Sequence, residues 1–203
     1  MQTNKAVNLI GIVGAGAMGA GIAQIASQAG QDVVLFDLSK EALTTSATKL
    51  QKVMNRLIEK GRVTSDEAIA IQERIVRTTN VTDLKDCDLI IEAVVEDLEV
   101  KKHVFKSIEE IAHKEAVIAS NTSSLSITSL ASFCAHPERV VGLHFFNPAP
   151  LMPLVEIIPA LQTNRDLPQQ LTELMRKWGK SPVIAKDTPG FIVNRVARPF
   201  YGE

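Results

Sequence analysis

The chain has 203 residues, 45% of them hydrophobic, which is enough apolar material for a sizeable core in one or two domains. Its 22 basic and 23 acidic residues give a net charge of −1, and this balance excludes the basic surface typical of proteins that bind nucleic acid. Two widely separated cysteines, Cys87 and Cys134, lie near no histidine at metal-ligand spacing and indicate reduced thiols in a cytoplasmic protein, with no disulfide framework or metal site.

Residues 9–23 are uncharged and follow Lys5, which gives them a superficial likeness to the core of a signal peptide. The stretch is shorter than the about 20 apolar residues that a membrane-spanning helix requires. It also contains five glycines, which suit a tight loop better than a membrane segment. We therefore expect a soluble protein that does not bind a membrane.

Short apolar strands alternate with helices along almost the whole chain. This alternation predicts an α/β protein with a Rossmann-type, doubly wound and mostly parallel sheet. The expected strands are residues 8–13, 32–37, 75–79, 89–94, 117–120, 140–144, 154–158 and 183–185, and the expected helices are 18–29, 39–60, 66–74, 98–113, 126–133 and 167–178.

The loop after the first strand has the pattern G-x-G-x-x-G in the stretch "GIVGAGAMGAGIA". Gly14 permits a tight turn, Gly16 lets the backbone approach a pyrophosphate, and Gly19 lets the helix pack close to the strand. Ala17 and Met18 lie between them, where the helix N-terminus stabilises phosphate charge. A preceding strand and a following helix make this pattern specific, and it predicts dinucleotide binding.

Asp37 ends the second strand, eighteen residues after Gly19. A carboxylate there can accept hydrogen bonds from a ribose hydroxyl and repels a 2′-phosphate, so we expect NAD in preference to NADP. Methyltransferases also use glycine loops, but they usually carry an acid just before the loop, where this chain has Val13.

Residues 39–74 contain a helical hairpin inserted into the alternating pattern. A long helix ends at Gly61, and a second begins at the capping box formed by Thr64 and Glu67. One stripe of the long helix is apolar and comprises Leu43, Leu50, Met54 and Leu57. Another is basic and comprises Lys49, Lys52, Arg56 and Lys60. Such a basic stripe is most often a solvated face.

His144 and Glu156 are twelve positions apart in "HFFNPAPLMPLVE". His144 ends a predicted strand at the edge where such folds hold ligands. Oxidation of an alcohol requires a base for the hydroxyl proton, and histidine, with an ordinary pKa of about 6.5, suits this role. Glu156, on the next strand, can orient the imidazole and stabilise its charged form. Without a cofactor nearby, a buried structural histidine would be the simpler interpretation.

Five stretches together resemble the NAD-dependent 3-hydroxyacyl-CoA dehydrogenase family, including its bacterial 3-hydroxybutyryl-CoA members. They are "GAGAMGAGIA", "IIEAVVEDLEVKK", "SNTSSLSIT", "GLHFFNPAPLMPLVEI" and "KDTPGFIVNR", and they extend along the whole chain. The resemblance implies interconversion of (S)-3-hydroxyacyl-CoA and 3-oxoacyl-CoA, such as acetoacetyl-CoA, with NAD as the cofactor.

The resemblance also implies roles for individual residues. His144 would be the general base with Glu156 as its partner, and Ser123 would lie between the nicotinamide and the substrate. Asn147 would contact the nicotinamide, Asn194 the substrate, and Glu96 and Lys101 the nicotinamide ribose. Spacing alone favours a different interpretation of the last two, as an acid in the first turn of a helix and a solvated lysine.

The hairpin, by the same resemblance, would hold coenzyme A, and Lys60 matches a contact of the family. Val53 stands where some relatives have a serine that binds coenzyme A.

The final stretch, "FIVNRVARPFYGE", predicts the start of a helix with Phe191, Ile192, Val196 and Phe200 on an apolar face that lacks a packing partner. We therefore expect an NAD-binding domain at residues 1–187, and at 188–203 the first turns of a helical domain. In the resembling family that domain closes over the acyl-CoA and forms a homodimer. A crystallin-like structural protein that binds NAD without activity is the alternative.

Overall fold

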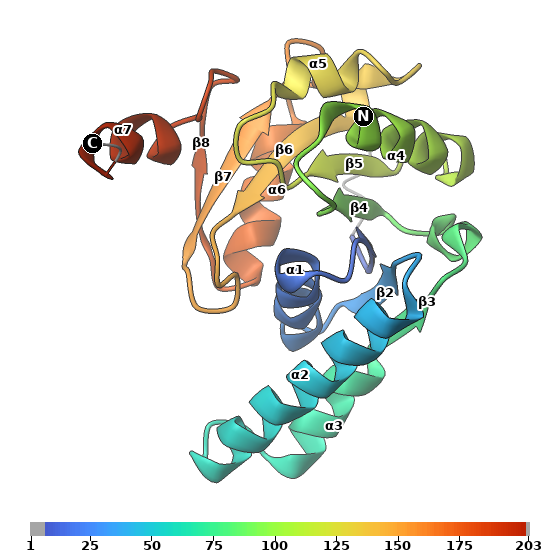
Figure 1. Ribbon diagram of the computed structural model, residues 1–203, viewed down its shortest axis with the longest axis vertical. Helices are drawn as coiled ribbons and strands as arrows, with labels where there is room; N and C mark the ends of the chain where they lie inside the picture. The colour runs from blue at the N-terminus through green and yellow to red at the C-terminus, as the bar shows by residue number, and fades with distance from the viewer. Residues whose placement is uncertain (1–6, 202–203) are drawn as a thin grey trace.

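The strands form one eight-stranded sheet in the order β3-β2-β1-β4-β5-β6-β7-β8 in the computed structural model, which describes residues 7–201 (Figure 1). The pairing is parallel throughout the described sheet except between β6 and β7, which are antiparallel. The strands are β1 Leu9–Val13, β2 Asp32–Phe36, β3 Ile75–Thr78, β4 Leu89–Glu92, β5 Val117–Ser120, β6 Val140–Phe145, β7 Leu154–Pro159 and β8 Ser181–Ile184.

Helices cover both faces of this sheet, as the doubly wound prediction requires. On one face, Ile22 of α1 and Met175 of α6 belong to the same core cluster as Ile12 of β1. On the other face, Phe105 of α4 and Leu130 of α5 belong to a second cluster. The helices are α1 Ala17–Gln28, α2 Lys40–Glu59, α3 Ser65–Glu73, α4 Leu98–Ile111, α5 Ile127–Ala131, α6 Leu167–Lys177 and α7 Val193–Tyr201, with short 3-10 turns at Val81–Leu84 and Pro137–Arg139.

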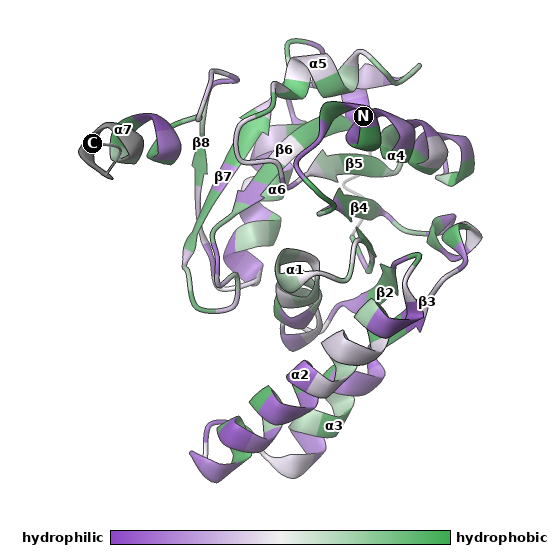
Figure 2. Ribbon diagram, viewed as in Figure 1, coloured by the Kyte–Doolittle hydropathy of each residue, from purple (hydrophilic) through white to green (hydrophobic). Residues whose placement is uncertain are grey.

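The helical hairpin of α2 and α3 extends away from the β3 edge of the sheet (Figure 1). Gly61 has φ +63° after the end of α2, and Thr64 and Glu67 form the reciprocal capping box that begins α3. The apolar residues Leu43, Leu50 and Met54 are buried. The four basic residues of the other stripe are exposed, and Figure 2 shows the hydrophilic character of α2 beside the hydrophobic strands of the sheet.

The expected strands and helices all occur, with ends displaced by a few residues. Among the strands, the last one differs most, because it was expected at 183–185 and lies at Ser181–Ile184. It contains Pro182, which cannot donate a backbone hydrogen bond. The strand pairs only with β7, at the edge of the described sheet, where proline is tolerated.

The prediction that Phe191 lies on an apolar face without a packing partner was wrong. Phe191 precedes α7, has φ +50°, and is only 3% exposed because it joins the core cluster of α4 and α5. Ile192 and Val196 are exposed, at 43% and 58%. The side chain of Phe200 lies outside the described side chains.

The segment between β8 and α7 is held against α5 by Asp187. Its carboxylate accepts hydrogen bonds from the backbone amides of Ile127 and Thr128, at 3.0 and 2.8 Å, and from the Ser126 hydroxyl at 2.9 Å. Burial raises the pKa of Asp187, but hydrogen bonds from Thr128, Ile127 and Ser126 outweigh it, and the net pKa is below its ordinary value. The ionised carboxylate therefore stabilises the folded chain.

We expect Asp187→Asn to lower the free energy of unfolding by about 1–2 kcal/mol at pH 7, the usual effect of losing a helix cap. Because the pKa of Asp187 is lower in the folded chain, its contribution is present above the ordinary value of 3.8 and is lost as the pH falls below it. Urea unfolding of both proteins should show that their difference in unfolding free energy becomes smaller as the pH falls below that value. Asp86→Asn, at an exposed position, is the control and should change little; a gap that widens in acid would contradict the assignment.

Candidate active site

The loop after β1 contains three glycines, and each position favours glycine for a different physical reason. Gly14 has φ +105°, and a Cβ there would lie 2.7 Å from the Ala93 carbonyl oxygen. A Cβ on Gly19 would collide with the Gly14 carbonyl oxygen. Gly16 faces open space, because a Cβ there would have no heavy atom within 4 Å, so a ligand can approach the backbone at this position.

The N-terminus of α1 is free to hold an anion. Gly16 is its N-cap, no side chain within the described residues caps it, and its first turn contains no acid. The first amides of a helix, here those of Ala17 and Met18, lack intrahelical acceptors and attract phosphate. The loop and this helix end therefore fit the pyrophosphate of a dinucleotide.

Asp37 follows β2 and lies against the glycine loop. Its Oδ2 accepts a hydrogen bond from the Ala15 amide at 2.7 Å, and its Oδ1 accepts one from the Ser39 amide at 2.8 Å. The half-buried carboxylate is thus fixed beside the loop, where it retains lone pairs for a ribose hydroxyl.

A cleft of about 620 Å³ adjoins this loop. Its walls are the glycine loop, the first helix of the hairpin and the turn from Asn147 to Pro150. Lys49 and Val53 line it, whereas Lys60 is exposed at the C-cap of α2 outside the lining. The predicted dinucleotide loop and part of the basic stripe therefore face one space.

His144 and Glu156 meet because β6 and β7 are antiparallel and these two residues are register partners. The His144 Nδ1 and Glu156 Oε2 atoms are 2.7 Å apart. Both residues are buried, His144 with 5% of its surface exposed and Glu156 with 0%. The other carboxylate oxygen of Glu156 accepts hydrogen bonds from the amides of Ile192 and Val193, each at 2.9 Å. With Nδ1 engaged, Nε2 is the imidazole nitrogen left for proton transfer.

Ser123 and Asn194 are brought together by the loop after β5 and the first turn of α7. The Asn194 side-chain amide donates to the Ser123 carbonyl oxygen at 3.0 Å. The same loop is joined to β6, because Asn121 Oδ1 accepts a hydrogen bond from the Phe145 amide at 2.9 Å. The Ser123 loop therefore lies beside the strand that carries His144.

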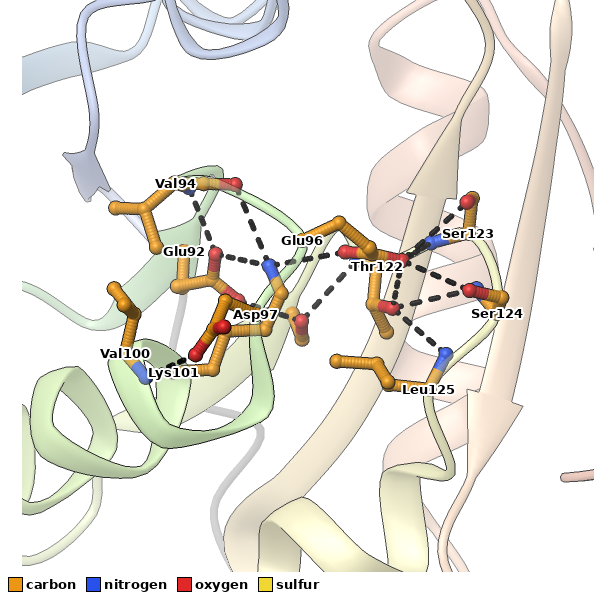
Figure 3. Close-up of polar contacts among 11 residues, drawn as sticks. Glu92, Val94, Glu96, Asp97, Val100, Lys101, Thr122, Ser123, Ser124 and Leu125 are labelled. Atoms are coloured by element: carbon orange, nitrogen blue, oxygen red, sulfur yellow. Dashed lines mark hydrogen bonds and ion pairs between the residues drawn. The ribbon is translucent and has the colours of Figure 1, made fainter.

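Glu96 holds the Ser123 loop from the side of β4 (Figure 3). Its Oε1 accepts hydrogen bonds from the Thr122 hydroxyl at 2.6 Å and the Ser123 amide at 2.9 Å, and its Oε2 lies 3.3 Å from the Lys101 ammonium. Burial raises the pKa of Glu96, but these hydrogen bonds and Lys101 outweigh it, and the net pKa is below the ordinary value.

Lys101 is only 1% exposed, so the interpretation from spacing as a solvated lysine was wrong. Its ammonium lies 2.6 Å from Oε1 of Glu92, a fully buried residue at the end of β4 that the sequence reasoning missed. A sequence signal was present, because Glu92 is an acid that ends the otherwise apolar run "LIIE". Lys101 also shares a helix face with the buried Phe105 and Ile108.

The described residues contain no group of three or more histidine, cysteine or acidic side chains placed to hold a metal ion. Cys87 and Cys134 are free and buried, and burial raises the pKa of each thiol to about 12. Within residues 7–201, none of the helices has both the length and the apolar character to cross a membrane.

Residues 9–188 match the family described as "3-hydroxyacyl-CoA dehydrogenase, NAD binding domain". The chain is 45% identical to a 3-hydroxyadipyl-CoA dehydrogenase of Escherichia coli, covering 97% of this chain and 42% of the relative. It is 43% identical to a probable 3-hydroxybutyryl-CoA dehydrogenase of Deinococcus radiodurans, covering 95% and 69%. The solved structure of a 3-hydroxybutyryl-CoA dehydrogenase from Escherichia coli matches with a TM-score of 0.95 and 44% identity, covering 98% of this chain and 42% of that one.

Two glycine substitutions should separate cofactor binding from folding. Gly16→Ala places a methyl group in the open space of the loop, so we expect NADH affinity to fall about tenfold, with a loss of unfolding free energy of at most about 1 kcal/mol. Gly19→Ala should destabilise the chain by about 1–3 kcal/mol, because its methyl group collides with the Gly14 carbonyl. Fluorescence titration and urea unfolding measure the two quantities. Unchanged NADH affinity in the Gly16 variant would place the cofactor elsewhere.

Proposed function

The chain belongs to the 3-hydroxyacyl-CoA dehydrogenase family, and we propose that it is the NAD-binding part of an enzyme that interconverts (S)-3-hydroxyacyl-CoA and 3-oxoacyl-CoA. The observation that carries this proposal is the buried contact of 2.7 Å between His144 and Glu156 at the ligand-binding edge of the sheet. The chain spans less than half of the length of the Escherichia coli relative. We therefore propose the activity for the whole enzyme and not for this chain alone.

In the proposed reaction, His144 Nε2 accepts the proton of the substrate hydroxyl. NAD, when bound, supplies the hydride acceptor for the carbon of the same alcohol. Glu156 fixes Nδ1 and stabilises the imidazolium that forms, and in the reverse direction His144 returns the proton to the 3-oxo oxygen. Ser123 and Asn194, linked through their 3.0 Å hydrogen bond, would position the reacting part of the substrate.

The proposed cofactor contacts run along the carboxyl edge of β1, β2, β4 and β5. The amides at Gly16, Ala17 and Met18 would hold the pyrophosphate, and Asp37 the adenine-side ribose. Glu96, with a 38% exposed side chain, would hold the nicotinamide ribose, and Lys101 would act through Glu96 because it is buried. Asn147, in the wall of the cleft, would contact the nicotinamide side.

The basic stripe of α2 would hold the phosphates of coenzyme A, with Lys60 at its end. The side chains of Lys49, Lys52, Arg56 and Lys60 are exposed and present charge on one helix. The exposed Ile192 and Val196 suit burial beneath a second, helical domain that begins within 188–203, and a homodimer would form through that domain. The free thiols fit a cytoplasmic location.

Cofactor choice tests the role of Asp37. The chain should bind NADH at least about tenfold more tightly than NADPH, which is about 1.4 kcal/mol, because the carboxylate repels a 2′-phosphate. Asp37→Ala should narrow that ratio. Titration by fluorescence measures both affinities, and equal or better binding of NADPH by the unmodified chain would remove this argument.

A double-mutant cycle tests the proposed function itself, in the chain completed to the length of its relatives. His144→Ala should reduce turnover of acetoacetyl-CoA by at least about 10²-fold, and Glu156→Gln should also cause a large loss, while NADH affinity stays nearly constant. The two losses should not add, because both residues act on one proton transfer.

Steady-state kinetics with NADH titrations measure this cycle. If the double variant loses the product of the two single losses, the residues act separately. If neither single change slows turnover, His144 is a structural core histidine. An unmodified protein that binds NADH without any turnover would instead favour the crystallin-like alternative.

A further inference from the structure

Glu92 is a buried acid that the proposed reaction does not use. It lies at the carboxyl end of β4 with 0% exposure. Its Oε1 accepts hydrogen bonds from the Lys101 ammonium at 2.6 Å and the Val94 amide at 2.8 Å, and its Oε2 accepts one from the Ser120 hydroxyl at 2.6 Å. One carboxylate thus joins the ends of β4 and β5 to the first turn of α4.

Lys101 extends this connection toward the solvent-facing loops (Figure 3). Besides Glu92, its ammonium lies 3.3 Å from Glu96 Oε2 and 3.5 Å from the Val94 carbonyl oxygen. Glu96 in turn holds Thr122 and Ser123. The polar chain therefore begins at a fully buried acid and ends at the Ser123 loop.

The loop that follows β4 lies at the point where the strand order of the sheet reverses, between β1 and β4. β1 pairs with β2 on one side and with β4 on the other, so the loops that follow β1 and β4 lead to opposite sides. The Ala93 amide donates to the Val13 carbonyl at 2.8 Å, which places the loop after β4 against the glycine loop. In open parallel sheets, ligands bind in the crevice at this switch point.

Stability alone is a weak reason for a buried ion pair here. Desolvating both charges costs free energy, and apolar residues of similar volume often stabilise a core equally well. A carboxylate and an ammonium, however, have directional partners, and these partners fix the loops that follow β4 and β5.

We propose that Glu92 is a positioning residue for the cofactor crevice. It fixes Lys101, and Lys101 and Glu96 then hold residues 93–97 and 121–125 in the shape that receives the nicotinamide half of NAD. This inference rests on the proposed NAD binding and adds a buried residue that acts through Lys101 and Glu96.

The test compares NADH affinity with stability in the present chain. Glu92→Gln keeps the size of the side chain but removes the charge, and it leaves Lys101 buried beside a neutral partner. We expect NADH affinity to fall about tenfold together with the urea midpoint. The double variant Glu92→Gln/Lys101→Met removes both charges, so its urea midpoint should recover, while its NADH affinity should stay about tenfold weaker because Glu96 has lost its cation.

Glu109→Gln is the matched control at the opposite end of α4. Glu109 also pairs with a buried cation, Arg139, at 3.4 Å, and it accepts hydrogen bonds from the Ala135 and His136 amides at 2.7 and 2.9 Å. This variant should lower the urea midpoint but change NADH affinity less than about twofold, a shift under about 0.5 kcal/mol.

The outcomes separate the possible failures. NADH affinity that recovers with stability in the double variant, or that never changes, would overturn the positioning role. If Glu92→Gln does not fold, Glu92→Asp decides, because it keeps the charge but draws it back from Lys101, and unchanged NADH affinity in that variant would overturn the positioning role. If the unmodified chain does not bind NADH, the cofactor assignment is wrong and this inference is lost with it.

Discussion

The Glu156 carboxylate accepts hydrogen bonds from an imidazole and from two backbone amides. The position of this buried carboxylate determines how the elements of the site are arranged. Its partner His144 is on β6, while the two amides belong to Ile192, which precedes α7, and Val193, the first residue of α7. A fully buried carboxylate must have such partners, because a charge removed from water is otherwise very costly. One carboxyl group thus joins β6 and β7 to the start of α7.

The reversal of chain direction after β6 is what brings His144 and Glu156 together. Within the described sheet, the pairing of β6 with β7 is the antiparallel exception, and it makes the two residues register partners. A parallel β7 would have required a crossover connection of a dozen or more residues, which would have separated them. The turn of residues 146–153 is too short for such a crossover. At the other end of the site, the buried ion pair between Glu92 of β4 and Lys101 of α4 joins a strand to a helix.

The sequence predicted those parts of the site that depend on local pattern. The glycine spacing and Asp37 lie in a strand-loop-helix unit whose geometry is set locally, and His144 and Glu156 lie on neighbouring strands of one hairpin. Lys101 was misjudged because its neighbours in sequence, Lys102 and Glu99, are charged, whereas its burial comes from sharing a helix face with Phe105. Phe191 was misjudged because its φ of +50° turns it back into the core, a conformation that non-glycine residues rarely adopt and that no residue pattern indicates.

The start of α7 belongs to the site as well as to the segment that follows. The Ile192 and Val193 amides satisfy Glu156 Oε1, and Asn194 in the next position donates to the Ser123 carbonyl. A displacement of α7 would therefore remove two donors from a buried carboxylate and one from the Ser123 loop. His144 would then be the remaining described donor to the buried Glu156 carboxylate. The position of α7 is for this reason coupled to the carboxylate that orients His144, although no residue of α7 contacts that imidazole through a hydrogen bond in the described chain.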